Sequence, residues 1–335
     1  MKQKINSKLN ILIIFSVTFI VLFFALKDDF NTIIHQILTI NPIFLILSFL
    51  LILAYYFLRT IVLHDIIIKF KKNYSFNDAF KITLQTQFFN GVTPFASGGG
   101  PFQVYMFKKD GIKISNGTNI FIQNFIVYQI ALVILGLIAV TLNHFMNLFK
   151  NISLLKYLVT FGFIINVLVI LGLFVLAFTT KLNKKIGRLI IKIFKKIVKN
   201  PKELISKWEE YVENFHDGAI VLLNNKTMFI KGVFYNFMAL IALYLIPLTL
   251  LYGMGKFDVI NSIETIVTSA YVMLIGSFVP IPGGTGGLEY GFTVFYGNYM
   301  TGAIVKSIML LWRFITYYFG MILGAICLNI KKKVK

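Results

Sequence analysis

The chain has 335 residues, 57% of them hydrophobic, and its 33 Lys and Arg against 13 Asp and Glu give a net charge of +20. A soluble protein of this length needs a charged surface, which 14% charged residues cannot provide. The basic residues lie between long apolar runs, and no nucleic-acid-binding motif is visible, so the charge indicates an anionic membrane surface as partner and no nucleic acid. We therefore expect an all-α polytopic membrane protein that forms a single transmembrane domain over 1–335.

Six apolar runs are long enough to cross a bilayer, which takes about 20 helical residues. They lie at 10–26, 42–64, 118–142, 155–179, 228–252 and 302–330, and Pro and Gly interrupt two further apolar segments at 82–107 and 265–299. Lys and Arg accumulate on the cytoplasmic side of membrane proteins. The basic clusters can share that side only if both interrupted segments return to the face they entered. We predict a multi-pass cell-membrane protein with both termini in the cytoplasm and two re-entrant segments that enter from opposite faces.

The first interrupted segment contains NGVTPFASGGGPFQVY, in which three consecutive glycines stand between Pro94 and Pro101. Irregular backbone at membrane depth is tolerated only where protein buries it or where it lines a cavity. Proline suits the first turn of a helix, so a half-helix should begin here. Its free N–H groups and partial positive charge predict a site for an anion, and phosphate is the obvious anion in a membrane. The predicted phosphate-binding residues are Gly98, Gly99, Gly100 and Gln103.

The second interrupted segment, GSFVPIPGGTGGLEYGF, resembles the first when Pro94 is placed over Pro280, which aligns Gln103 with Glu289. We interpret the pair as a weak inverted repeat, the arrangement from which many transporters build a site at the membrane midplane. Breaks used for packing alone are the alternative. The predicted phosphate-binding residues here are Gly283, Gly284, Gly286 and Gly287, and the residues that break the helices are Pro94, Pro101, Pro280 and Pro282.

Glu289 and Arg313 are the charged residues placed deepest in the predicted spans. An ionisable residue near mid-membrane is usually functional, so we predict that Arg313 binds phosphate. Glu289 would meet a cationic headgroup or pair with Arg313, and a purely structural ion pair is the alternative. Arg59 lies nearer the cytoplasmic end of its span, and we expect it to reach the lipid headgroups. Three polar residues of the third span could line a cavity or bond helices together: Gln123, Asn124 and Tyr128.

The segment 181–226 is the one sizeable piece that does not span. Its first part places Ile186, Leu189, Ile190, Ile193, Phe194, Ile197 and Val198 on one helical face, and basic residues cover the other. This pattern is typical of a helix in the cytoplasmic interface of an anionic membrane, although a solvated basic segment is equally consistent with it. A second amphipathic helix after Pro201 could fold back on the first. The single cysteine, Cys327, and four scattered histidines give no ligand spacing, so we predict no metal, no cofactor and no catalytic residue.

Three stretches, in their order and spacing, resemble the transmembrane domain of the lysylphosphatidylglycerol synthase/flippase family, also called multiple peptide resistance factors. They are NGVTPFASGGGPFQVYMFKKDGI, GSFVPIPGGTGGLEYGF and LLWRFITYY. The resemblance covers nearly the whole chain. It implies a membrane protein that handles phosphatidylglycerol or its lysyl derivative. Full-length members attach lysine from lysyl-tRNA to phosphatidylglycerol and move the product outward, which gives resistance to cationic peptides. Their transfer domain follows the spans, whereas this sequence ends at Lys335 just after its last span, so we expect the flippase half alone.

Three functions follow as alternatives. The first is translocation of an anionic or aminoacylated phospholipid between leaflets, which would contribute to peptide resistance. The second is the phosphatidylglycerol lysyltransferase activity that the family name implies. The third is a non-catalytic membrane subunit that docks a separate synthase, or a second copy of itself, through its basic segment.

Overall fold

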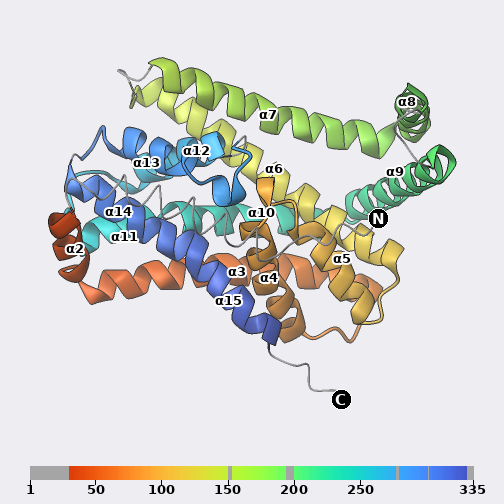
Figure 1. Cartoon of the computed structure of the whole chain (residues 1–335), viewed down its shortest axis with the longest axis horizontal. Coiled ribbons are helices and arrows are strands. Elements are labelled where there is room, and N and C mark those ends of the chain that lie inside the picture. The colour runs from red at the N-terminus through yellow and green to blue at the C-terminus, as the bar shows by residue number, and fades with distance from the viewer. Residues whose placement is uncertain (1–29, 150–152, 194–199, 277–278, 301, 330–335) are drawn as a thin grey trace.

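The computed structural model describes residues 30–149, 153–193, 200–276, 279–300 and 302–329. Every regular element in these ranges is a helix, which confirms the all-α class. The long helices run side by side along the longest axis of the molecule (Figure 1). They enclose an apolar core and leave large apolar side chains on the outside, as expected where lipid is the solvent.

Four described helices, some continuing across a break, are long and apolar enough to cross a membrane. They are α3 (Pro42–Phe70), α6 (Ile114–Met146), α10 (Lys226–Tyr244) with α11 (Ile246–Gly253), and α14 (Ala303–Arg313) with α15 (Phe319–Asn329). A fifth candidate is α7 (Ser153–Phe178), taken together with α8 (Thr180–Ile193). These helices coincide with five of the six predicted spans, and the remaining one, 10–26, lies outside the described residues.

Both interrupted segments fold as helical hairpins. The first consists of α4 (Phe76–Gly91), the short turn η1 (Pro94–Ala96) and α5 (Gly99–Lys109). The second consists of α12 (Ser262–Gly276), the turn η2 (Pro282–Gly284) and α13 (Gly287–Tyr296). In Figure 1, α12 and α13 lie toward the end of the molecule that holds α2 (Phe30–Leu38), whereas α4 and α5 lie toward the end that holds α9. The two turns pack against each other, so the hairpins meet tip to tip.

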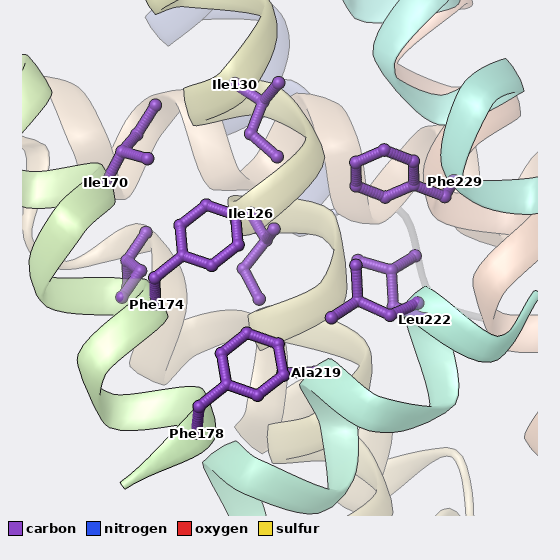
Figure 2. Close-up of a pocket in the computed structure, with 10 residues that line it drawn as sticks. Ile126, Ile130, Ile170, Phe174, Phe178, Ala219, Leu222 and Phe229 are labelled. Atoms are coloured by element: carbon purple, nitrogen blue, oxygen red, sulfur yellow. The ribbon is translucent and has the colours of Figure 1, made fainter. Parts of the chain in front are cut away.

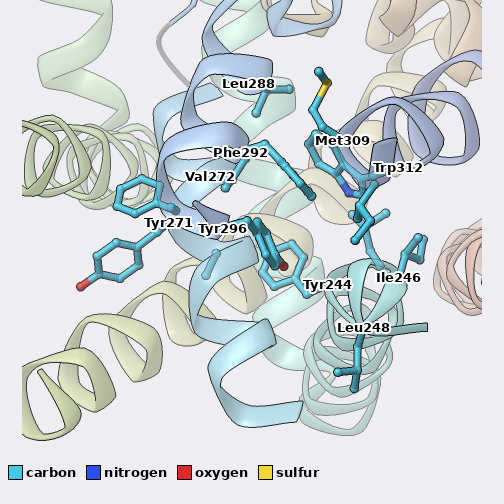
Figure 3. Close-up of a cluster of buried hydrophobic side chains, with 14 of the residues drawn as sticks. Tyr244, Ile246, Leu248, Tyr271, Val272, Leu288, Phe292, Tyr296, Met309 and Trp312 are labelled. Carbon is cyan, nitrogen blue, oxygen red and sulfur yellow. The ribbon is translucent and has the colours of Figure 1, made fainter. Parts of the chain in front are cut away.

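Stacked aromatic rings attach the second hairpin to the last span. Phe292 of α13 stacks on Tyr296 and on Trp312 of α14, with ring centroids 4.3 and 4.9 Å apart (Figure 3). All three rings are buried in the larger of two apolar clusters formed by the described residues. Because interiors are close-packed, this contact fixes the height of α13 against α14. It thereby sets the position of the residues in the first turn of α13.

The basic segment forms α8 and α9 (Pro201–Asn224), which fold back on each other as predicted. Arg188 and Glu209 pair at 2.5 Å, and the Trp208 indole donates to the Asn183 carbonyl at 3.0 Å while it packs against Gly187. α8 is turned by 108° from α7. Its apolar residues Ile186, Leu189, Ile190 and Ile193 are exposed, and Phe194, Ile197 and Val198 of the predicted face lie outside the described residues. An exposed apolar stripe on a helix across the bundle direction is what an interfacial helix presents.

The predicted topology places Lys109, at the end of α5, in the cytoplasm and Asp258, after α11, outside. On a Cys327→Ala background, we expect Asp258→Cys to react with a membrane-impermeant thiol reagent in intact cells and Lys109→Cys to react only after the cells are opened. External labelling at Lys109→Cys would contradict the re-entrant assignment.

Candidate functional site

The two hairpin tips share one backbone conformation. In η1 the φ angles of Phe95 and Ala96 are both 53°, and in η2 those of Gly283 and Gly284 are 67° and 62°. Pro94 therefore corresponds to Pro282. The predicted register, with Pro94 on Pro280, was wrong by two residues. Gln103 consequently matches a glycine of α13 rather than Glu289.

The glycines of the first tip serve close packing rather than unusual backbone angles. Gly98 has φ −76°, and none of the three consecutive glycines has a positive φ. A Cβ on Gly99 would lie 2.1 Å from Asn90 Oδ1, and one on Gly100 would lie 2.6 Å from the Phe121 ring. Positive φ angles occur instead at Phe95 and Ala96, so the tip of the first hairpin is strained at two residues with side chains.

Glu289 and Arg313 form a buried ion pair at the second tip. Arg313 Nε lies 2.7 Å from Glu289 Oε1, and 4% and 10% of the respective side chains are exposed. The Nε–H is not aligned for a hydrogen bond, so this is a contact between charges. Arg313 Nη2 donates to the Gly283 carbonyl at 3.0 Å and lies 3.4 Å from the Thr285 hydroxyl. The arginine therefore fastens the tip of the second hairpin to the last span.

One turn further along, Tyr317 fastens the first hairpin. Its hydroxyl donates to the Gly91 carbonyl at the end of α4 at 2.9 Å, and the Arg313 guanidinium lies 4.6 Å from its ring. Tyr317 belongs to a π-helical turn, η3 (Phe314–Tyr318), which joins α14 to α15. Such turns occur frequently at functional sites. The last span thus touches both hairpins through residues at neighbouring positions.

Three adjoining cavities surround the tips, with volumes of about 380, 370 and 230 Å³. Ala96 of η1 and Tyr128 of α6 line all three. Gly100 and Gln103 line the first, Gly283 lines the second and third, Gly284 lines the second, and Arg313 lines the third. Some residues predicted from each Gly-rich motif therefore line adjoining cavities, whereas Gly98, Gly99, Gly286 and Gly287 line none of the three.

Arg59 has a neighbour that the sequence analysis did not predict. Its guanidinium lies 4.0 Å from the centre of the Tyr128 ring, and the residue lines the first cavity. Asn124 and Tyr128 line the same cavity, whereas Gln123 is fully buried outside it. The sequence holds a signal for a ring contact of Arg59, because Tyr55 and Arg59 are four residues apart and therefore share one helical face.

The two half-helix starts differ electrostatically. At the start of α13, Glu289 Oε2 accepts the Gly286 N–H at 2.7 Å, so a carboxylate of the chain already occupies that end. The start of α5 has no acidic residue in its first turn, and Pro101 stands where Glu289 stands in α13. A helix start attracts negative charge. At the start of α5 the neutral Thr93 Oγ1 accepts the Gly98 N–H at 2.8 Å, and Gly100 lines the same cavity as Arg59.

A further crevice lies between α6, α7, α9 and α10 (Figure 2). Its lining is entirely apolar: Ile126, Ile130, Ile170, Leu173, Phe174, Phe178, Ala219, Leu222, Leu223 and Phe229. Such a surface provides no hydrogen-bonding partner for a headgroup. Another cavity, of about 570 Å³, does have charged residues in its lining: Asp78 and Lys81 of α4, Lys109 of α5, and Asp110.

The family model described as "Lysylphosphatidylglycerol synthase TM region" matches residues 9–324. The chain belongs to this family. A UPF0104 membrane protein of Archaeoglobus fulgidus is 23% identical over 301 residues, which cover 86% of this chain and 87% of that protein. Family membership relates the chain to lysylphosphatidylglycerol metabolism in membranes and supports a phospholipid as its substrate.

Proposed function

We propose that this member of the family translocates a phospholipid between the leaflets of the cell membrane. The observation that carries the proposal is that two helical hairpins meet tip to tip beside three adjoining cavities. The phosphate of the lipid binds at the start of α5, and the second tip, held by Arg313 and Glu289, closes the path from the opposite side. Rocking of one repeat against the other exposes the cavities to each leaflet in turn.

The residues around the cavities favour translocation over aminoacyl transfer. Acid–base transfer usually needs a histidine or a carboxylate at the reacting atoms. Among the described residues that line the three cavities there is no His, Asp or Glu. Glu289 is the nearby carboxylate, and its two oxygens contact Arg313 and the Gly286 N–H.

The physiological role depends on the lipid. Moving lysyl-phosphatidylglycerol outward would lower the negative charge of the outer leaflet and contribute to resistance against cationic peptides. Moving an unmodified anionic lipid would not.

The test is leaflet-resolved labelling with the purified chain in phosphatidylcholine vesicles that contain trace amounts of headgroup-labelled phosphatidylglycerol and lysyl-phosphatidylglycerol. We expect labelled lipid from the inner leaflet to become accessible to an impermeant quencher outside only in vesicles that contain the protein. We expect no lysyl-phosphatidylglycerol to form when lysyl-tRNA is added. Product formation without leaflet exchange would support the lysyltransferase instead. If neither leaflet exchange nor product formation is found, the docking subunit remains as the function.

A further inference from the structure

We infer that α8 docks on the anionic leaflet of the membrane that holds the spans, and that Lys181, Lys185 and Lys192 bind the phosphates of that leaflet. The surface consists of exposed residues, none of which lines the cavities at the hairpin tips, so the inference goes beyond the proposed function. The partner is a lipid surface recognised by its charge, and not one particular headgroup.

The residues of α8 form three faces around its axis, at about 100° per residue. The first face packs on the protein, because Asn183, Gly187 and Ile191 recur every four residues and all three are buried. The second face is basic. The third face is apolar, and its side chains are between 43% and 67% exposed: Leu182, Ile186, Leu189, Ile190 and Ile193. A helix with one apolar and one basic face, neither of them covered by the described part of the chain, is typical of a lipid interface.

The basic face contains two sets of residues. Lys184 and Arg188 lie nearest the packed face, and each forms an ion pair with a glutamate of α9, Glu213 and Glu209 respectively. The other three are exposed and lie further from the packed face: Lys181, Lys185 and Lys192. Among the described residues no carboxylate forms an ion pair with any of these three. The pairs with α9 therefore hold the helical hairpin together, and the three remaining lysines are available to a partner outside the chain.

The position of α8 places its apolar face at the membrane surface. α8 begins at Thr180, two residues after α7 ends at Phe178, and it is turned by 108° from α7. In Figure 1, α7 runs along the long axis of the molecule and α8 lies across its end. Exposed apolar side chains of α7, among them Leu168, Leu171 and Val175, are typical of a span in contact with lipid. A helix that leaves such a span at nearly a right angle runs along the bilayer surface, where an apolar face meets the acyl chains.

Anionic lipid matches the charge of this surface as well as its apolar face. α8 contains five basic residues and no acidic one, and α9 neutralises two of the five. A lysine of an interfacial helix buries its methylene stem along the lipid and holds its ammonium at the level of the headgroup phosphates. An anionic leaflet thereby supplies the negative charges that the described part of the chain does not.

The test measures the depth of α8 in the membrane with the full chain. On a Cys327→Ala background, Ile190→Cys carries a polarity-sensitive fluorophore, and the protein is placed singly in nanodiscs of phosphatidylcholine, alone or with phosphatidylserine or phosphatidylglycerol. We expect a nitroxide-labelled lipid to quench the fluorophore and a soluble quencher to have little access to it. Each lysine near an anionic surface favours the bound state about fivefold. Both anionic lipids should therefore increase the lipid quenching and shift the emission to shorter wavelength.

Three variants assign the effect to the two faces. Replacing the three unpaired lysines together should abolish the response to anionic lipid: Lys181→Gln, Lys185→Gln and Lys192→Gln. The matched control removes three exposed lysines of other elements and should keep the response: Lys72→Gln, Lys108→Gln and Lys113→Gln. Ile186→Gln with Ile193→Gln should reduce lipid quenching in every membrane, and because both side chains are exposed the fold should be retained.

Access of the soluble quencher in every membrane would overturn the inference in favour of a solvated segment. Equal lipid quenching with and without anionic lipid would refute the role of the three lysines, and a response to phosphatidylglycerol alone would refute recognition by charge. Shielding that requires two copies of the chain in one nanodisc would overturn the inference by assigning the face to a second copy. None of these readouts involves leaflet exchange, so failure of the inference is distinguishable from failure of the proposed function.

Discussion

Arg313→Gln should lower the free energy of unfolding by about 3–5 kcal/mol, because it leaves the Glu289 carboxylate uncompensated in a buried position. The variant also loses the bond from Nη2 to the Gly283 carbonyl, so the tip of the second hairpin is released from the last span. Glu289→Gln should destabilise the chain to a similar degree, since it leaves the guanidinium uncompensated. Reversible unfolding in mixed detergent measures both effects, and leaflet exchange should be impaired in both variants.

The double variant Glu289→Gln, Arg313→Gln separates the charge effect from the loss of contacts. It buries no uncompensated charge, and the amide oxygen that replaces the Glu289 carboxylate can still accept the Gly286 N–H. We therefore expect it to be more stable than either single variant, which gives a coupling energy of about 1–3 kcal/mol in the double-mutant cycle. The exposed pair Arg188 and Glu209 is the matched control, and its double neutralisation should leave the unfolding free energy unchanged. Strict additivity at Glu289 and Arg313 would refute a stabilising pair.

Exchanging the two charges should not rescue the fold. Glu289→Arg places a cation at the start of α13, where the Gly286 N–H now donates to a carboxylate and the helix start carries partial positive charge. The pair is therefore directional. Recovery of the unfolding free energy by Glu289→Arg with Arg313→Glu would show that the start of α13 does not influence which residue of the pair carries the negative charge.

The two hairpins could be predicted from the sequence because the Pro, Gly and apolar content of their segments is enough to indicate them. Clustered proline and glycine favour a break in a helix, and apolar flanks indicate that both segments lie in the membrane. The register between the repeats could not be predicted in the same way, because residue type alone allows either Pro280 or Pro282 to be aligned with Pro94. What decides the match is backbone conformation, and in the first tip Phe95 and Ala96 adopt the angles that Gly283 and Gly284 adopt in the second.

The contact of Arg59 with Tyr128 could not be predicted for a different reason. Depth along a span indicates how far a side chain lies from the interface, but it does not indicate which neighbour the side chain meets. The α6 helix places Tyr128 against Arg59, a contact between residues far apart in the sequence. By contrast, the proximity of Glu289 and Arg313 could be anticipated, because few charges lie deep in the spans and low dielectric favours their pairing.

Joining the two hairpin tips should abolish leaflet exchange. η1 and η2 are in contact, and alternating access requires one repeat to move against the other. Ala96 and Pro282 are suitable positions, because each lies in one of the two turns and neither contributes a hydrogen-bonding side chain. On a Cys327→Ala background, Ala96→Cys with Pro282→Cys can be linked by a short thiol-specific reagent that reduction cleaves.

The decisive measurement is the rate of phosphatidylglycerol exchange in the same vesicles before linking, after linking and after reduction, with the two single-cysteine variants treated identically. If the tips gate the lipid path, exchange stops in the linked double variant, returns on reduction and is unaffected in the single variants. Unchanged exchange in the fully linked protein would contradict the account, because lipid would then cross without movement of the hairpins.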